Sequence, residues 1–518
     1  MQTRKEKLIE FVKSIRDAVH DEWVRFEFSH LRIARLIVYS MCLVVVVSIC
    51  FYLFRYFNLF HTDVNSARYM LSALVQSQAA IVAIVITLTL IAVQLTASAY
   101  SPRVIDIFKK NPDMWILLGC YGVSIFYGFI VLKRVVGADG DVVSQSAIWS
   151  IGPISISFEF YVSLAYWLGA FTFVVLFPYL LNIVGLLKPE NVIKRLAIEI
   201  TKDKILNSKE DPVQPIMDII HASIMKYDLE TTRIGLKTVT VQVPEIIFAD
   251  DEKKISRYFC DHLTRVGRVA ISREDEESTL VVIENFKNFA KSTAEKGLKT
   301  ATMLAARSLG KVGKAAAGKG LEHATTVAAW SLGEVRKAAT EKELEDATNQ
   351  AVFSLGEVGK AAAENGLEDA TMQAVSSLGW AGKATAEKEL EDATKLAAMS
   401  LGKVGEAAAE KELEDATKLA AMSLGDVGEA AAENGLGVAT REAAKSLGRV
   451  GKGAAGKGLE HATKRAARSL AELTILSEEL VKAVIQDYEL KEEQDQVSFQ
   501  KFIKIYEQEL KELRAKKN

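Results

Sequence analysis

The feature that most constrains this chain is a 23-residue repeat in its second half. Leucine recurs at this period without insertion or deletion, at Leu309, Leu332, Leu355, Leu378, Leu401, Leu424, Leu447 and Leu470. A fixed period of roughly 20–50 residues is typical of solenoids, in which each copy buries its apolar face only by stacking on the next copy. The sequence therefore predicts an α-solenoid over residues 262–476.

Within one copy the apolar residues have helical spacing. Leu390, Ala393, Ala397, Leu401 and Val404 follow one another at intervals of three or four residues, as on one face of a helix. Most copies also contain two glycines in the motif "LGxVG", and glycine in a helix interior costs ~1 kcal/mol relative to alanine. We therefore expect each copy to break there into a helix of about 13 residues, a turn at "GxVG" and a shorter second helix. The "SLGxVG" segment resembles the turn of HEAT-like repeats, although a copy here is shorter than theirs.

Two repeat segments have the glycine and lysine spacing of a phosphate-binding loop. "GKAAAGKG" (313–320) and "GKGAAGKG" (451–458) both end in glycine, where that loop needs a Ser or Thr hydroxyl. Glutamate takes the place of Gly318 in five other copies, and Arg336 takes the place of Gly313 in the next copy. A carboxylate at the first of these positions would repel phosphate, so we expect no nucleotide binding.

No other motif in the sequence indicates chemistry. The seven histidines contain no HxH or HxxxH pair, the four cysteines contain no CxxC pair, and no nucleophile motif is present. The net charge of −2 gives no reason to expect nucleic acid as a partner. We therefore expect neither an enzyme nor a metal or cofactor site.

Four apolar runs in the first half are long enough to cross a bilayer, at about residues 36–54, 70–99, 114–132 and 160–187. The first is 19 residues without a charge, which makes about 28 Å of helix. Basic residues flank the runs before the first, between the second and third, and after the fourth. The preference of such residues for the cytoplasmic side predicts a multi-pass protein of the cell membrane with both termini in the cytoplasm.

The second run carries a stripe of small and polar residues on one helical face: Gln76, Ala80, Ala83, Thr87, Gln94 and Ser98. Such a stripe faces protein or water rather than lipid. One interpretation is that it packs against other spans, because small residues allow close approach and Gln or Thr can form hydrogen bonds between helices. The alternative is that it lines a pore in a symmetric oligomer.

The end of this run carries a family resemblance. The segment "VITLTLIAVQLTASAYSPRVIDIF", with the motif Ser101, Pro102 and Arg103, and the segment "DPVQPIMDIIHASI" (211–224) resemble an uncharacterised family of predicted four-span membrane proteins, a domain of unknown function. The resemblance covers about residues 36–240 and implies an integral membrane protein without an established activity. On physical grounds, Pro102 would end or bend the helix, and Arg103 would lie within reach of lipid phosphates.

These patterns predict an all-α chain of five parts. They are a basic amphipathic N-terminal helix (1–35), a transmembrane domain (36–187), a cytoplasmic helical linker domain (188–261), the cytoplasmic α-solenoid (262–476) and C-terminal helices (477–518). Apolar residues at helical spacing in the last part suit a helix that caps the solenoid or pairs with a neighbour.

Two functions fit these parts. The first is a membrane-anchored scaffold or spacer whose solenoid binds a protein partner. The second is an oligomeric ion channel lined by the second span, with the solenoid as a gating or assembly domain. The segment 387–436, with twelve acidic and five basic residues, is either a face kept soluble by its charge or a groove for a basic partner.

Overall fold

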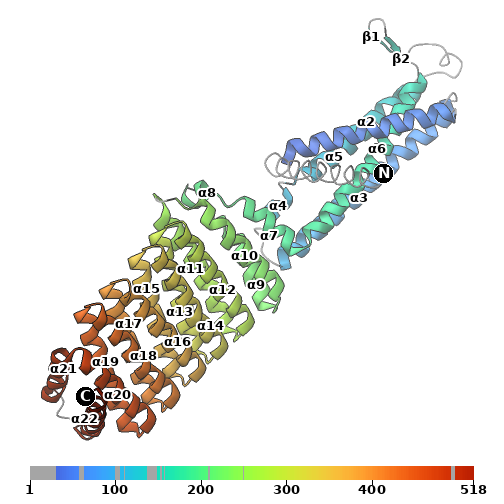
Figure 1. Cartoon of the computed structure of the whole chain (residues 1–518). Helices are drawn as coiled ribbons and strands as arrows, with labels where there is room; N and C mark the ends of the chain where they lie inside the picture. Colours follow the sequence, from blue (N-terminus) through green and yellow to red (C-terminus); the bar gives the residue numbers. More distant parts are fainter. Residues whose placement is uncertain are drawn as a thin grey trace, which may run out of the picture. The chain divides into compact units, whose positions relative to one another are not determined.

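The computed structural model describes residues 31–57, 64–99, 105–109, 111–136, 149–151, 154–156, 158–207, 211–248, 250–491 and 496–517 (Figure 1). The chain divides into two compact units, Met1–Val192 and Ile193–Asn518. Almost all described residues are helical, which confirms the all-α prediction. The exception is a short antiparallel pair of strands, β1 (Trp149–Ile151) and β2 (Ile154–Ile156). The amphipathic helix predicted for 1–35 lies almost wholly outside the described residues.

The first unit contains four long apolar helices: α2 (Leu31–Tyr56), α3 (Val64–Ala99), α5 (Pro112–Val136) and α6 (Phe158–Leu186). Each is long and apolar enough to cross a membrane, so the four predicted spans are confirmed as candidate spans. Helix α4 (Ile105–Lys109) is a single short turn between α3 and α5.

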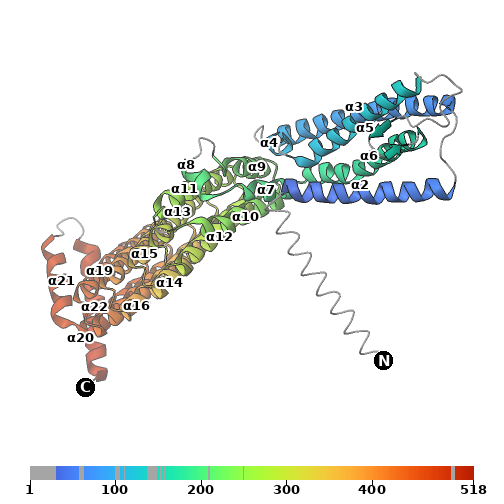
Figure 2. The ribbon, with the colours of Figure 1, turned by 90° about the horizontal axis from the view of Figure 1, so that it is seen from above.

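In this bundle α5 and α6 lie between α2 and α3 (Figure 2). Helix α6 contacts the other three and continues through Pro178. Its Trp167 is 1% exposed and meets Phe51 and Phe54 of α2 edge to face, with ring centroids 5.8 Å apart in both pairs. Aromatic packing of this kind joins α2 to α6 in the bundle interior.

The second unit starts with α7 (Pro189–Ile198, entering from the first unit), α8 (Lys202–Asn207), α9 (Gln214–Met225), α10 (Leu229–Ile246) and α11 (Glu252–Ser272). Helix α10 packs on α9 and α12, and α11 packs on α12 and α13. Helices α10 and α11 are therefore already members of the stacked array. The array therefore begins before residue 262, inside the segment that we predicted to be a separate linker.

The repeat copies form one helix each: α12 (Glu276–Glu295), α13 (Lys299–Gly318), α14 (Glu322–Glu341), α15 (Glu345–Glu364), α16 (Glu368–Ala386), α17 (Glu391–Glu410), α18 (Glu414–Glu433), α19 (Gly437–Lys457) and α20 (Glu460–Leu476). The "LGxVG" motif lies inside these helices. The predicted break at this motif, with a second short helix in each copy, is therefore wrong.

Close packing explains why the glycines stay helical. A Cβ atom on Gly356 would lie 2.7 Å from the Ser400 Cβ of the helix two copies later, and one on Gly359 would lie 2.7 Å from the Ala374 Cβ of the next helix. Any larger residue would push these helices apart. Glycine at these positions lowers helix propensity but lets neighbouring helices pack closely. The stabilisation from this packing cannot be read from the sequence pattern of one isolated copy.

The turn lies about ten residues further on, where each helix from α11 to α19 is followed by a residue of positive φ. In the α13 copy Gly320 has φ +73°, and the N–H groups of Gly320 and Leu321 donate to the carbonyls of Ala317 (3.0 Å) and Ala316 (3.1 Å). This pattern is a Schellman motif. The segment "GKAAAGKG" is thus the end of a helix and its turn.

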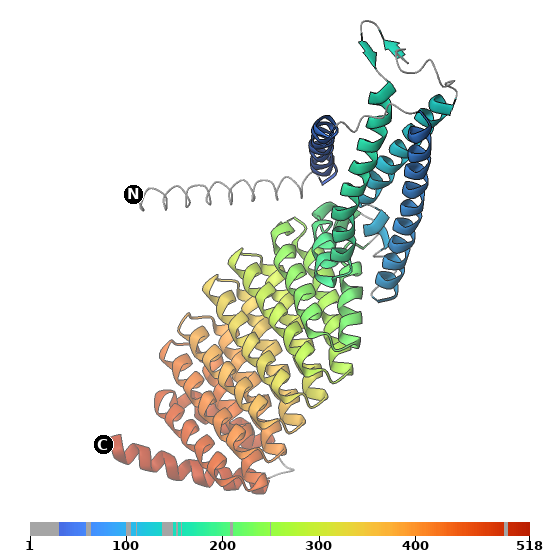
Figure 3. The same cartoon turned by 90° about the vertical axis from the view of Figure 1, so that its right-hand side faces the viewer.

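Alternate helices form two layers (Figure 3). Each helix packs on the next helix and on the next but one. Two copies therefore make one pair of helices, and the α-solenoid prediction is confirmed.

Helices α21 (Glu478–Lys491) and α22 (Gln496–Lys517) pack on α19 and α20 at the C-terminal end of the array. Phe502 is fully buried and sits against Gly451, and the Tyr506 and Thr474 hydroxyls are 3.0 Å apart. This part of the chain covers the last repeat, as in the capping interpretation.

Candidate functional site

The stripe predicted on the second span faces away from the rest of the bundle. All six side chains are exposed in the single chain: Gln76, Ala80, Ala83, Thr87, Gln94 and Ser98. The interpretation that they pack against other spans of the same chain is therefore not met. The stripe remains available to lipid or to another copy of the chain.

A different face of α3 packs in the bundle. Its buried residues include Val75, Gln78, Val85, Thr89 and Thr96. They follow the three and four residue spacing of a coiled-coil seam, as the exposed stripe also does. Gln78 and Ala80 are two positions apart, which places them about 200° apart around the helix. Periodicity alone therefore could not decide which of the two faces is inside.

Polar contacts cross the bundle at two levels of this seam. Gln78 Nε2 donates to Ser124 Oγ at 2.9 Å and to Thr172 Oγ1 at 3.4 Å. Further along α3, the hydroxyls of Thr89 and Tyr179 share a hydrogen bond. These bonds tie α3 to α5 and α6 in a region where water is not available to satisfy polar groups.

A third polar group closes one end of the bundle, around Asp113 at the start of α5. Tyr39 donates to Asp113 at 3.3 Å, Asn182 donates to it as well, and Arg35 Nε lies 3.6 Å from the carboxylate. Asp113 is 1% exposed. The group joins three spans and neutralises a buried charge by pairing.

The motif Ser101, Pro102 and Arg103 lies outside the described residues, so its predicted place at the membrane interface stays a prediction.

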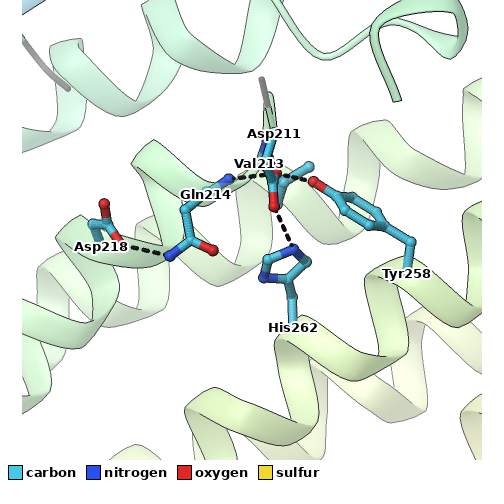
Figure 4. A network of polar contacts seen from close by, with 6 residues as sticks. All are labelled: Asp211, Val213, Gln214, Asp218, Tyr258 and His262. Carbon is cyan, nitrogen blue, oxygen red and sulfur yellow. Dashed lines mark hydrogen bonds and ion pairs between the residues drawn. The ribbon is translucent and has the colours of Figure 1, made fainter. Parts of the chain in front are cut away.

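In the second unit, the loop before α9 is fastened by a polar network (Figure 4). Asp211 accepts hydrogen bonds from the N–H groups of Val213 (3.0 Å) and Gln214 (2.9 Å) and from the Tyr258 hydroxyl. Its other oxygen lies 3.0 Å from Nε2 of the buried His262. Burial raises the pKa of Asp211, but the contacts with His262 and the two N–H groups lower it, and its pKa ends below the ordinary value. The network has no free nucleophile and fits a structural role.

A groove of about 660 Å³ lies between α14 and α16. Trp330, Arg336 and Lys337 line it from α14, and Gln373 and Trp380 line it from α16. The two tryptophans are 45% and 73% exposed, although large aromatic residues are uncommon on the surface of this array. We call this cavity the α14–α16 groove.

The groove lies where the copies depart from their consensus. Arg336 stands where six other copies have glycine, from Gly313 to Gly451, and Trp380 stands where seven other copies have a charged residue, from Lys311 to Glu472. The consensus glycine packs on a valine 45 residues later, as Gly313 does on Val358. The residue 45 positions after Arg336 is Ala381, so an alanine takes the place of the facing valine.

Helix spacing changes at the same place. A Cβ on Gly333 of α14 would lie 3.4 Å from the Ser377 Cβ, whereas the equivalent distance is 2.6 Å for Gly310 and Ser354. Smaller Ala381 and this wider spacing leave room for the Arg336 side chain. Sequence reasoning noted Arg336 only as evidence against phosphate; aligning the copies would have singled out positions 336, 380 and 381 together.

Three basic and two acidic side chains line the groove, a small positive excess. Arg336 is 8% exposed, its Nε has no hydrogen-bond partner, and no ion pair of its guanidinium occurs among the described residues. Burial lowers the pKa of Arg336, and electrostatic attraction to Glu334 and Glu341 offsets part of that decrease, so the guanidinium keeps its charge at neutral pH. Of the neighbouring carboxylates, Glu334 pairs with Lys291 of α12 at 3.3 Å.

Within the described ranges, no group of three or more His, Cys, Asp or Glu side chains could hold a metal ion.

Comparison with known proteins finds a family match for only part of the chain. A search of curated proteins finds no match. Among solved structures the chain is similar to a "Circular tandem repeat protein with novel repeat topology and enhanced subunit contact surfaces", at 13% identity and a TM-score of 0.33, over 70% of this chain and 94% of that chain. Residues 32–225 match the family model described as "Predicted membrane protein (DUF2254)". The matched segment contains all four candidate spans and most of the region, about residues 36–240, whose resemblance to an uncharacterised four-span family the sequence indicated.

Proposed function

We propose that this membrane protein is an interaction scaffold. The four spans anchor it in the cell membrane, and the helical array lies in the cytoplasm and binds a protein partner in the α14–α16 groove. The proposal includes no catalysis and no cofactor, nucleotide or nucleic acid.

One observation carries the proposal: the departures from the repeat consensus that lie together at the groove. Copies such as 387–402 and 410–425 are identical, so the array needs no tryptophan or arginine at these positions in order to fold. Trp380 is the most exposed tryptophan described in the array, at 73%. Exposed tryptophans beside a buried arginine are the residue types that dominate protein interfaces.

The test is site-specific photocrosslinking in intact membranes. A benzophenone amino acid replaces Trp380, and the matched control replaces Phe353 of α15, which is 45% exposed. We expect a protein adduct at position 380 that is missing at 353, with the crosslinked partner segment identified by mass spectrometry. Lipid adducts alone at 380, or the same adducts at both positions, would contradict the scaffold.

A second function is favoured by the exposed stripe on α3. A glutamine at Gln76 or Gln94 is costly against lipid, and a second copy or a water-filled pore would remove that cost. The alternative is therefore a homo-oligomeric channel with Thr87 facing the conduction path.

Planar bilayer recordings of the purified protein test this alternative. A channel predicts single-channel currents that Thr87→Trp reduces, because the larger side chain would narrow the pore. The absence of current across several ions and voltages would remove it. The recordings do not depend on the outcome of photocrosslinking at position 380, so the two experiments test the two functions separately.

A further inference from the structure

We infer that the α14–α16 groove binds an acidic segment of its protein partner, with one partner carboxylate on the Arg336 guanidinium and an adjacent apolar side chain on Trp380. This inference rests on the proposed scaffold function and names the chemistry of the partner.

Arg336 places a buried charge in the groove. A buried charge is normally paired, because leaving it unpaired is costly, yet Arg336 is 8% exposed and its Nε has no partner. Its planar guanidinium matches a carboxylate through two parallel hydrogen bonds. Glu334 and Glu341 attract this charge without forming an ion pair with it in the described part of the chain, and a partner carboxylate would add direct hydrogen bonds to the guanidinium.

The packing around position 336 accommodates an arginine. The consensus glycine leaves no space beside the valine that faces it: a Cβ on Gly382 would lie 2.5 Å from Val427 Cγ2. At the Arg336 position the facing residue is Ala381, which is fully buried. Arginine in place of the glycine alone would clash with the facing valine. With alanine at position 381 as well, the arginine side chain has room.

Charge selects the ligand. Lys337 and Lys388 line the groove with Arg336, and Lys287 of α12 lies 4.7 Å from the ring centroid of Trp330. Glu334 and Glu341 also line it, so a singly charged carboxylate is favoured over a phosphate that carries more charge. The same positive balance disfavours the basic N-terminal segment of this chain, with Arg4, Lys5 and Lys7, as the occupant.

The remaining lining suits a peptide. Gln373 Nε2 donates to Ser377 Oγ at 3.1 Å, and both side chains line the groove with spare donors and acceptors. A peptide backbone offers both kinds of group. Trp380 adds an apolar surface at the edge, where an aliphatic or aromatic partner side chain can be covered.

The experiment selects ligands without knowing the partner. Random dodecapeptides are displayed against the full-length protein in nanodiscs, with counter-selection against Trp380→Lys. Lysine occupies the equivalent position 403 and glycine and valine occupy those of 336 and 381 in other copies, so Trp380→Lys and the double variant Arg336→Gly/Ala381→Val keep residues with which the array already folds. Phe353→Lys is the matched surface control, because position 445 is lysine.

We expect the selected peptides to contain Asp or Glu beside an apolar residue. The double variant should weaken binding by about tenfold, and so should replacing the peptide acid by its amide. The two changes should not add, because both remove one contact. Phe353→Lys should leave the affinity unchanged.

Three results would contradict the inferred acidic partner, and they differ in whether the scaffold function also fails. Equal affinity for the acid and amide peptides, with the Trp380→Lys loss retained, would overturn the acidic partner and leave the scaffold standing. Loss of all selective enrichment, or an equal loss in Phe353→Lys, would overturn the scaffold as well. Displacement of the peptide by phosphatidylserine vesicles or inorganic phosphate, but not by phosphatidylcholine vesicles, would assign Arg336 to a phosphate or lipid headgroup instead.

Discussion

At the scale of single residues, the ends of the repeat helices depend on a few atoms. The N-cap residue of α19 is Leu436, which has no side-chain acceptor. The cap comes instead from a glutamate two helices earlier: Glu391 accepts from the Val438 N–H at 2.9 Å, and Glu414 accepts from the His461 N–H at 3.1 Å. Part of the acidic charge of 387–436 therefore caps helices and favours their positive ends, rather than forming a basic-partner groove.

The turn residue offers a direct test. Glu389 has φ +57° and is exposed, and a side chain in this conformation costs roughly 1 kcal/mol that glycine avoids. We expect Glu389→Gly to stabilise the protein by about 0.5–1 kcal/mol in urea unfolding followed by circular dichroism. Glu387→Gly is the matched control, because Glu387 has φ −60° and glycine there should destabilise. Equal effects of the two variants would refute the explanation.

The Asp211 network gives a pH-dependent prediction. Because the pKa of Asp211 is lowered in the folded protein, its carboxylate stabilises the fold above the ordinary pKa of an aspartate. That stabilisation is lost as the pH falls through the lowered value. Asp211→Asn should cost about 1–2 kcal/mol at neutral pH and should flatten the acid side of the stability profile.

The measurement is the urea midpoint of the wild type and the variant across this pH range. Asp261→Asn, at an exposed carboxyl on the same helix as His262, is the control and should keep the wild-type slope. A profile of Asp211→Asn parallel to the wild type would show that the network is not coupled to folding.

At the scale of elements, the glycines of each repeat helix serve its neighbours. The first glycine of "LGxVG" meets a serine two helices later, and the second meets the next helix and the next but one. Helix propensity is a contribution of about 1 kcal/mol, whereas separating two packed helices affects many contacts at once. Packing therefore outweighs propensity in every copy.

Two alanine substitutions in α13 separate these effects. A Cβ on Gly310 would lie 2.6 Å from the Ser354 Cβ, whereas one on Gly318 would meet nothing within 4 Å. We expect Gly310→Ala to destabilise by about 1–3 kcal/mol and Gly318→Ala to stabilise by up to about 1 kcal/mol. Urea midpoints of both variants check this, and stabilisation by Gly310→Ala would show that the helices can move apart freely.

At the scale of the whole molecule, one repeat sequence serves both layers of the array. Helices α17 and α18 share the unchanged segment 387–402 and 410–425, yet consecutive helices belong to opposite layers. The layer of a helix is set by the order of stacking and not by its own residues. This is the quasi-one-dimensional behaviour of a solenoid, and it makes a local departure such as Trp380 stand out.

Four candidate spans, an even number, predict that both ends of the chain lie on one side of the membrane. With cysteine introduced in a variant lacking the four native cysteines, we expect an impermeant maleimide to label Asp139→Cys on intact cells. Glu389→Cys should react only after permeabilisation, since basic residues favour the cytoplasmic side. The reverse pattern would invert the topology and remove the cytoplasmic scaffold.

The sequence by itself determined the four spans, the helical character and the period of the array, because these depend on the length and spacing of apolar residues. Only the tertiary structure decided which face of α3 is inside, since the exposed stripe and the buried seam have the same spacing. It also decided that the glycines stay helical, because their benefit comes from residues in later copies such as Ser354 and Ser400. The α14–α16 groove was also decided only by the tertiary structure. Arg336, Trp380 and Ala381 come together only when two helices lie side by side.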